Sequence, residues 1–437
     1  MKTINKSFLA LSILGLLLPF SVFATNGLYQ HGYGVRNNAM AGAGVALPLD
    51  ALAAATNPAG TVMIGDHKDI GLALFSPERS YTVNGAPSGG FPPFPGPQVD
   101  SDSTLFAIPS FGWNKPLNDQ SAFNISVYGN GGMNTDWNAA DTPTIPTPMG
   151  PAGGTFLAGD TGVDYAQLFL NLNYARKISE SSSVGISGII NYSELELKGL
   201  RGFSGFSVDP TKLTNNGKDS DFGYGIKIGG LFALGDSVDL GITYQSEISN
   251  TLDDYAGLFA NGGELDIPAT ATIGLAFEIN DRSSIAFDVQ QIFYEDADAI
   301  GNPGTSSPTS GLFACAGGDF SSCLGGNNGT GFGWEDMTIF KVGYQIRTSD
   351  DMVWRFGISQ GDQPIPNSEV LFNIIAPGVM ETHVTAGFSK TLANGNDLSF
   401  ALMYAPEKCI TGPSAFNPGQ TVELCMDQLQ LELGYSW

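Results

Sequence analysis

An alternation of apolar and polar residues runs through most of this chain and constrains the fold more than any other feature. The last nine residues show it most clearly, since every second one is apolar: Leu429, Leu431, Leu433, Tyr435 and Trp437. A period of two places these side chains on one face of a β-strand. The same pattern recurs from Asp69 onward, so the sequence predicts a protein built mainly of strands.

Turn residues between the alternating stretches divide this region into about fourteen strands. We expect them at about 69–82, 102–116, 120–132, 164–178, 182–197, 221–234, 237–249, 268–280, 283–294, 336–348, 352–360, 380–391, 397–405 and 427–437. Their connections alternate between short turns, such as Asp281–Arg282, and long loops, such as 295–335. An even number of strands, with short turns on one rim and long loops on the other, is typical of outer-membrane barrels.

The apolar face of these strands carries the side chains that lipid would contact in a barrel. In one strand it includes Leu168, Leu170 and Leu172, whereas the position between the last two holds Asn171. A soluble sandwich would bury the apolar face between two sheets, but it would not sort its loops so regularly. We therefore predict an all-β fold: a 14-stranded antiparallel transmembrane β-barrel, residues 68–437, plugged by a small, partly helical N-terminal hatch.

The N-terminus has the parts of a secretory signal peptide. Lys2 and Lys6 precede an apolar stretch from Phe8 to Phe23, and Val22-Phe23-Ala24 forms a cleavage site. The alternative is an uncleaved anchor, although the apolar stretch is short for a membrane span. We expect residues 1–24 to be removed on secretion. A secreted barrel is predicted to reside in the bacterial outer membrane, in contact with its lipid and lipopolysaccharide.

Residues 25–67 differ from everything that follows. They are rich in Gly and Ala, carry helix formers at Ala53-Ala54-Ala55, and reach a helix stop and turn at Asn57-Pro58-Ala59-Gly60. A module of about forty residues is too small to hold a core alone. We expect it to pack inside the barrel as the hatch.

The charge balance excludes one class of partner. The chain holds 43 acidic and 19 basic residues, a net charge of −24, and the loss of Lys2 and Lys6 would change this to −26. Nucleic acid binding needs a basic surface, so it is not expected. The acidic residues gather in loop-like stretches such as Asp253-Asp254, where they favour solubility or a divalent-cation contact with lipopolysaccharide.

The four cysteines form two local pairs, Cys315 with Cys323 and Cys409 with Cys425, in segments that we expect to be loops. In an oxidising envelope this arrangement favours two disulfides that close those loops.

No metal site or cofactor is expected, because His31, His67 and His383 are scattered and no CxxC spacing occurs. The sequence is also not predicted to be an enzyme.

Several motifs together resemble the FadL family of outer-membrane transporters for long-chain fatty acids, whose relatives import toluene and xylene. They are 34–44 (GVRNNAMAGAG), Asp50 with Asn57-Pro58-Ala59-Gly60, 265–270 (LDIPAT) and 375–378 (IAPG), and the similarity spans the mature chain. The resemblance implies a hatch that closes the barrel, with Asn57, Pro58 and Ala59 as its motif. It also implies a monomer.

The resemblance further implies that substrate leaves sideways, at a kink in the third strand. In this sequence the third strand contains Gly129, Gly131 and Gly132, and glycine inside a strand marks a bulge or kink. The alternative is that these glycines only end the strand before a Gly-rich loop.

Two sets of residues are candidates for substrate binding. Phe156, Leu157, Leu258 and Phe259 lie in expected loops, where they could form a capture groove or only each loop's own hydrophobic cluster.

The alternation also makes Lys227, Lys341 and Arg355 face the lumen. There these side chains could hold a carboxylate head group, or pair with Asp288 or Glu432. A fatty acid and a neutral hydrocarbon therefore both remain possible substrates.

The predicted function is passive, ligand-gated uptake of hydrophobic molecules with lateral exit. The alternative is a general diffusion porin for small polar solutes, which needs an open lumen and leaves no role for the hatch.

Overall fold

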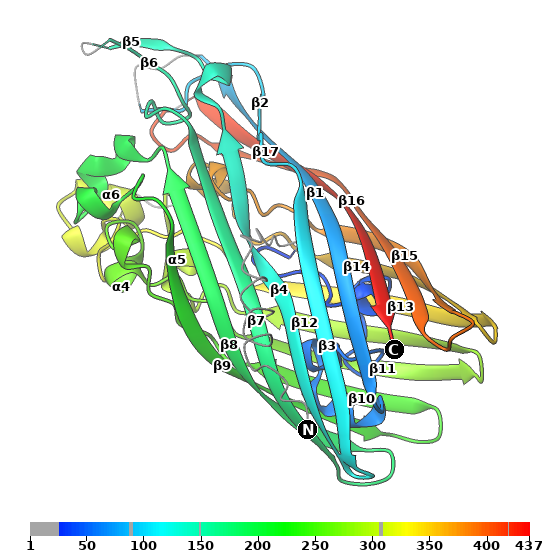
Figure 1. The fold of residues 1–437 in the computed structure, drawn as a ribbon. Helices are drawn as coiled ribbons and strands as arrows, with labels where there is room; N and C mark the ends of the chain where they lie inside the picture. Colours follow the sequence, from blue (N-terminus) through cyan, green and yellow to red (C-terminus); the bar gives the residue numbers. More distant parts are fainter. Residues whose placement is uncertain (1–25, 87–90, 148–149, 306–308, 418) are drawn as a thin grey trace, which may run out of the picture.

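The computed structural model describes residues 26–437 except 87–90, 148–149, 306–308 and 418, so the predicted signal peptide lies outside the described residues. Fourteen antiparallel strands form a closed barrel, because the last strand pairs with the first (Figure 1). They are β1 (His67–Gly85), β3 (Phe106–Asn118), β4 (Ser121–Trp137), β7 (Thr161–Lys177), β8 (Ser183–Lys198), β9 (Asp219–Ala233), β10 (Val238–Gln245), β11 (Thr270–Asn280), β12 (Ser283–Ile292), β13 (Met337–Ser349), β14 (Met352–Gly361), β15 (Thr382–Thr391), β16 (Asp397–Pro413) and β17 (Gln420–Ser436). The predicted fold class is confirmed.

Three shorter strands lie among the loops: β2 (Val99–Asp100), β5 (Ile145–Thr147) and β6 (Gly150–Ala152). The loops also hold three short helices, α4 (Ala260–Gly263), α5 (Asp298–Gly301) and α6 (Gly311–Ala316), on the same rim of the barrel (Figure 1). No helix in the described part of the chain is long and apolar enough to cross a lipid bilayer.

The last two strands extend beyond their predicted ends. We expected the connection between them to run from 406 to 426, but β16 continues to Pro413 and β17 begins at Gln420. The placement of Cys409 and Cys425 in a loop is therefore wrong, because the two residues are directly paired across β16 and β17. The reason is that Val422, Leu424 and Met426 continue the inward-facing alternation above the membrane belt.

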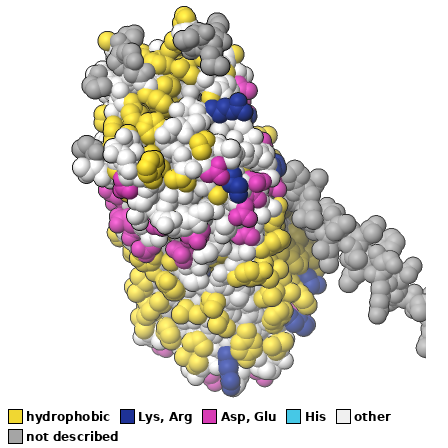
Figure 2. Space-filling model, turned by 90° about the vertical axis from the view of Figure 1, so that its left-hand side faces the viewer, with side chains coloured by type: hydrophobic (Ala, Val, Ile, Leu, Met, Phe, Trp, Pro, Cys, Tyr) yellow, Lys and Arg dark blue, Asp and Glu magenta, His cyan; other side chains and the backbone are white. Residues whose placement is uncertain are grey.

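The two faces of the barrel have opposite chemistry. Outward-facing side chains such as Leu72, Ile228 and Leu433 are about half exposed. Figure 2 shows hydrophobic side chains over the lower part of the face in view. Inward-facing positions on the same strands hold buried polar residues such as Asn171 and Gln430. This is the pattern of a barrel whose outer face meets lipid.

The N-terminal segment, residues 26–66, packs against the inner face of the wall. It contains α2 (Val35–Asn38), α3 (Ala53–Thr56) and the 3-10 helix η1 (Pro58–Met63). Helix α2 lies against β16, whereas η1 lies against β4, β7, β8 and β9. This segment lies so close to the wall that a Cβ atom at several inward glycines would lie within 3 Å of its atoms: Gly112, Gly185, Gly229, Gly241, Gly343, Gly357, Gly387 and Gly434. At Gly241, a Cβ atom would lie 2.2 Å from the carbonyl oxygen of Val45.

This close fit predicts that Gly241→Val displaces the N-terminal segment, whereas Gly188→Val does not. Gly188 also lies in a strand, but a Cβ atom there would meet nothing within 4 Å. Overpacking against backbone typically costs about 1–3 kcal/mol. We expect trypsin to cleave Gly241→Val after Arg36 faster than it cleaves the control. Equal cleavage of the two variants would contradict the tight fit.

Candidate functional site

The Asn57-Pro58-Ala59 motif joins the N-terminal segment to the barrel wall. The Asn57 side chain donates to the carbonyl oxygens of Val45 (2.7 Å) and Gly230 (3.0 Å), and its Oδ1 accepts from the amide of Ala59. Pro58 occupies the first turn of η1, where its missing N–H costs nothing. The Ser183 hydroxyl on β8 donates to the Ala59 carbonyl at 2.7 Å. The motif is therefore an anchor on the wall.

Two of the three predicted lumen cations also hold this segment. Lys341 donates to the carbonyl of His31 at 2.8 Å, and Lys227 donates to the carbonyl of Ala55. Arg355 instead donates to the Ser389 hydroxyl at 2.7 Å on the neighbouring strand. All three side chains are buried, and none forms an ion pair among the described residues. The two lysines thus bind backbone carbonyls, and Arg355 binds a hydroxyl, in place of the carboxylates of Asp288 or Glu432.

The space between the N-terminal segment and strands β9–β13 is polar. A cavity of about 30 Å³ there is lined by His31, Lys227, Asp288 and Lys341, among others. Asp288 accepts from the amides of Gly44 and Val45, at 2.7 and 2.9 Å. Burial lowers the pKa of His31 well below its usual value, so its ring is neutral where it stacks on His383. Charged and polar side chains thus make up most of the lining of this lower lumen.

The predicted capture residues lie within the hydrophobic interior of the loop region. Phe156, Leu258 and Phe259 are each no more than 2% exposed, and Leu157 is half-buried. Phe156 packs against Phe203 with ring centroids 5.0 Å apart. The structure brings these residues into the loop core, and their role in binding stays a prediction.

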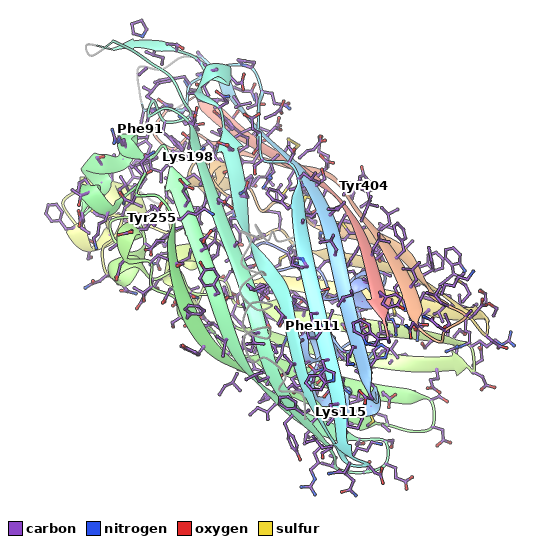
Figure 3. The ribbon with its side chains drawn as sticks, in the orientation of Figure 1. Phe91, Phe111, Lys115, Lys198, Tyr255 and Tyr404 are labelled. Carbon is purple, nitrogen blue, oxygen red and sulfur yellow. A yellow bond between two sulfur atoms is a disulfide. The ribbon has the colours of Figure 1, made fainter. Side chains whose placement is uncertain are left out.

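A column of aromatic rings, which we call the aromatic column, connects the loop surface with the interior. Its members, in order, are Phe416, Phe91, Phe203, Phe372, Phe332, Trp334 and Tyr294, with successive ring centroids 4.9–6.3 Å apart. Such spacing is typical of packed aromatic pairs. Phe91 and Phe416 are partly exposed, whereas the other five are buried. Figure 3 shows Phe91 on the loop side of the barrel.

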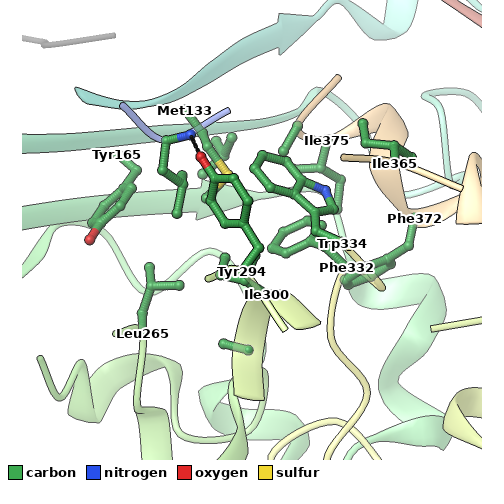
Figure 4. Close-up of a cluster of buried hydrophobic side chains, with 14 of the residues drawn as sticks. Met133, Tyr165, Leu265, Tyr294, Ile300, Phe332, Trp334, Ile365, Phe372 and Ile375 are labelled. Atoms are coloured by element: carbon green, nitrogen blue, oxygen red, sulfur yellow. Dashed lines mark hydrogen bonds between the residues drawn. The ribbon is translucent and has the colours of Figure 1, made fainter. Parts of the chain in front are cut away.

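The lower end of the aromatic column meets the start of the N-terminal segment. The Tyr294 hydroxyl accepts from the amide of Leu28 at 2.8 Å, and Figure 4 shows its ring beside Trp334 and Met133. Beside Trp334 lies a cavity of about 30 Å³, which we call the inner cavity. Its lining is Gly27, Phe75, Arg79, Gly132, Met133, Asn134, Trp334, Ala376, Pro377, Gly378 and Met426. Apart from Arg79 and Asn134, these side chains are apolar or absent.

The wall of the barrel is irregular beside the inner cavity. The pairing of β4 with β7 shifts by one residue between Gly129 and Gly131, which leaves Asn130 as an extra, bulged residue. The amide of Gln30 donates to the carbonyl of Asn130 at 2.9 Å. At Gly131, a Cβ atom would lie 1.7 Å from the carbonyl oxygen of Leu28. The glycines of the third barrel strand thus allow a bulge and a close approach of the N-terminal segment.

The wall also loses a strand at this point. The β3–β4 pairing ends at Ser110 and Tyr128, although β4 continues to Trp137. The β1–β3 pairing ends at Phe75 and Phe106, although β1 continues to Gly85. Above this level, β1 and β4 therefore have no complete strand between them.

Two disulfides fasten the loop side, and both predicted pairs are confirmed. Cys315 is joined to Cys323, and Cys409 to Cys425. The first pair links α6 to the turn that follows it, and the second links β16 to β17.

Sequence reasoning missed the aromatic column and Arg79. The column draws rings from loops far apart in the chain, and no local spacing reveals their contact. Arg79 follows the inward alternation of β1, but a polar inward residue is ordinary in a barrel.

Comparison with protein-family models finds a match over most of the chain. Residues 21–411 match the family described as outer membrane protein transport protein (OMPP1/FadL/TodX). A comparison with curated protein sequences finds no match.

Solved structures share the fold. The crystal structure of the P. putida toluene transporter TodX has a TM-score of 0.63 at 16% identity and covers 93% of this chain and 98% of its own. The Ralstonia pickettii toluene transporter TbuX has a TM-score of 0.62 at 16% identity, with coverages of 93% and 98%. A Pseudomonas aeruginosa FadL homologue has a TM-score of 0.65 at 15% identity, with coverages of 94% and 99%. At these identities the likeness shows the fold.

The contacts of Asn57 predict a local loss of stability when its side chain is removed. Asn57→Ala leaves buried backbone groups unpaired, which costs about 1–3 kcal/mol. We expect faster amide hydrogen exchange around residues 44–60, measured by mass spectrometry. The control is Asn394→Ala in an exposed turn. An unchanged exchange rate in Asn57→Ala would show that the motif does not anchor the segment.

Proposed function

The chain belongs to the OMPP1/FadL/TodX family of outer membrane transport proteins, and from this premise we propose that it takes up hydrophobic molecules passively and releases them sideways through its wall. The family establishes an outer-membrane channel for hydrophobic compounds that is not an enzyme. The proposal adds the route, the gate and the substrate class, which is long-chain fatty acids or aromatic hydrocarbons.

The observation that carries the proposal is the position of the inner cavity. It lies between the lower end of the aromatic column and the part of the wall where β1 and β4 lack a complete strand between them. A hydrophobic molecule that follows the column reaches this wall before it meets the polar lower lumen. Leaving sideways spares the molecule the passage through the polar lower lumen.

The N-terminal segment acts as the hatch in this proposal, with residues 1–24 as a signal peptide, 25–67 as the hatch and 68–437 as the barrel. Its anchors at Asn57, Lys227 and Lys341 keep the lower lumen closed to water. The inner cavity on the route is small, about 30 Å³, so a ligand has to displace side chains as it enters. Ligand-driven displacement is the proposed gate, and a monomer is sufficient for it.

The direct test is uptake by an outer-membrane transport mutant that expresses this chain. Labelled oleate and toluene are compared in the wild type, in a variant that lacks Asn130, and in Asn130→Ala. Deleting Asn130 removes the bulge and restores a continuous β4–β7 alternation, whereas Asn130→Ala keeps the bulge. We expect the deletion to reduce uptake of the transported compound at least about tenfold, and Asn130→Ala to reduce it much less.

Two results would contradict the proposed function. If neither oleate nor toluene enters faster than in the empty mutant while small sugars do, the protein is a diffusion porin. If the deletion transports as well as the wild type, the exit does not lie at β4.

A further inference from the structure

An irregular stretch, residues 101–105, occupies the place of the missing strand. We call it the bridging segment. The amide of Ser101 donates to the Arg79 carbonyl on β1 at 2.9 Å, and the amide of Asp102 donates to the Asp136 carbonyl on β4 at 2.9 Å. The Ser76 hydroxyl donates to the Thr104 carbonyl at 2.9 Å. Single hydrogen bonds, rather than a ladder, thus close the wall here.

The Arg79 side chain spans the same gap. It points inward from β1 and is 5% exposed. One guanidinium nitrogen donates to the Asn134 carbonyl on β4, and the other donates to the Ser103 carbonyl in the bridging segment. The guanidinium also lies 5.9 Å from the ring centroid of Phe106, at the start of β3. Arg79 therefore ties together the structural elements that border the gap.

The partners of Arg79 leave its charge without a counterion. It forms no ion pair among the described residues, and its Nε atom is buried without a hydrogen-bond partner. A buried charge is costly unless it is paired and hydrogen-bonded. A carboxylate satisfies a guanidinium better than two carbonyls do, because it is charged and binds in a bidentate manner.

The surroundings determine from which side an anion can arrive. Arg79 is the one charged residue of those that line the inner cavity. On its other side lies a cleft of about 220 Å³ that is lined by four carboxylates: Glu78, Asp100, Glu407 and Asp427. These repel an anion from outside, whereas the inner cavity is apolar and leads to the aromatic column.

We propose that Arg79 is a specificity residue of the exit, and that it selects hydrophobic molecules with a carboxylate head. The ligand carboxylate takes the guanidinium from the carbonyls of Asn134 and Ser103, which frees the bridging segment and opens the wall between β1 and β4. The apolar tail lies against the rings of the aromatic column. This inference rests on the proposed function and names its substrate class as long-chain carboxylates.

The test compares two ligands with the same tail, oleate and methyl oleate, in cells that depend on this chain for uptake. Wild type is expected to take up oleate at least about tenfold faster, because a charged hydrogen bond contributes about 1.5–3 kcal/mol. In Arg79→Met this preference should disappear, because Arg79 no longer holds the wall closed and methyl oleate can pass as well. Arg347→Met, at an exposed position near the turns, is the matched control and should keep the preference.

The outcomes separate this inference from the proposed function. If neither ligand enters the wild type, lateral uptake itself fails. If both enter wild type at equal rates, or if Arg79→Met keeps the wild-type ratio, Arg79 does not select the ligand.

A second variant keeps the test valid if Arg79→Met does not fold. Ser80 and Asp100 are antiparallel partners, so Ser80→Cys with Asp100→Cys can join β2, which directly precedes the bridging segment, to β1 by a disulfide. We expect oleate uptake to be lost when the bond is oxidised and restored by a reductant, with wild type given the same treatment as control. Undiminished uptake in the oxidised form would overturn the proposal.

Discussion

A barrel wall in lipid has to satisfy every backbone N–H and C=O group within itself, and the rest of this structure depends on that constraint. The pairing of β1 with β17, from Asp69 with Ser436 to Gly85 with Gln420, closes the sheet and removes its edges. Between β1 and β4, above Phe75, the ladder gives way to single hydrogen bonds. Because fewer bonds break there than in a full ladder, an opening in the wall costs less at that place.

Closure also determines what the interior can transport. The outer face is apolar, so the inner face is largely polar, and the N-terminal segment fills it through backbone contacts and glycines such as Gly241. The free energy of a hydrophobic molecule would rise if it moved from apolar surroundings into that polar lumen. The aromatic column ends above the polar region, beside the irregular wall. The different chemistry of the two faces of one closed sheet is therefore the basis of the proposed sideways exit.

The sequence predicted those features that depend on local periodicity. Fourteen strands, their faces, both disulfides and the inward direction of Lys227 follow from alternation and spacing. The partner of Lys227, the carbonyl of Ala55, could not be predicted, because it depends on where a separate segment sits in the lumen. Cys409 was placed in a loop because the predicted strands ended at the membrane belt, whereas the β16–β17 hairpin continues above it. The aromatic column could not be predicted either, because its rings come from separate loops.

Buried cations with carbonyl partners recur in this barrel, and their positions give them different consequences. Lys227 and Lys341 bind carbonyls of the N-terminal segment within a polar lumen, so replacing those bonds would loosen the filling of the barrel. Arg79 binds carbonyls that hold the wall itself, beside apolar side chains. A carbonyl is a neutral acceptor, so an incoming anion can displace it from a cation, whereas a carboxylate already paired there would resist displacement. Because Arg79 has no counterion among the described residues, the wall in this proposal responds to a ligand's charge while the ladder around it stays intact.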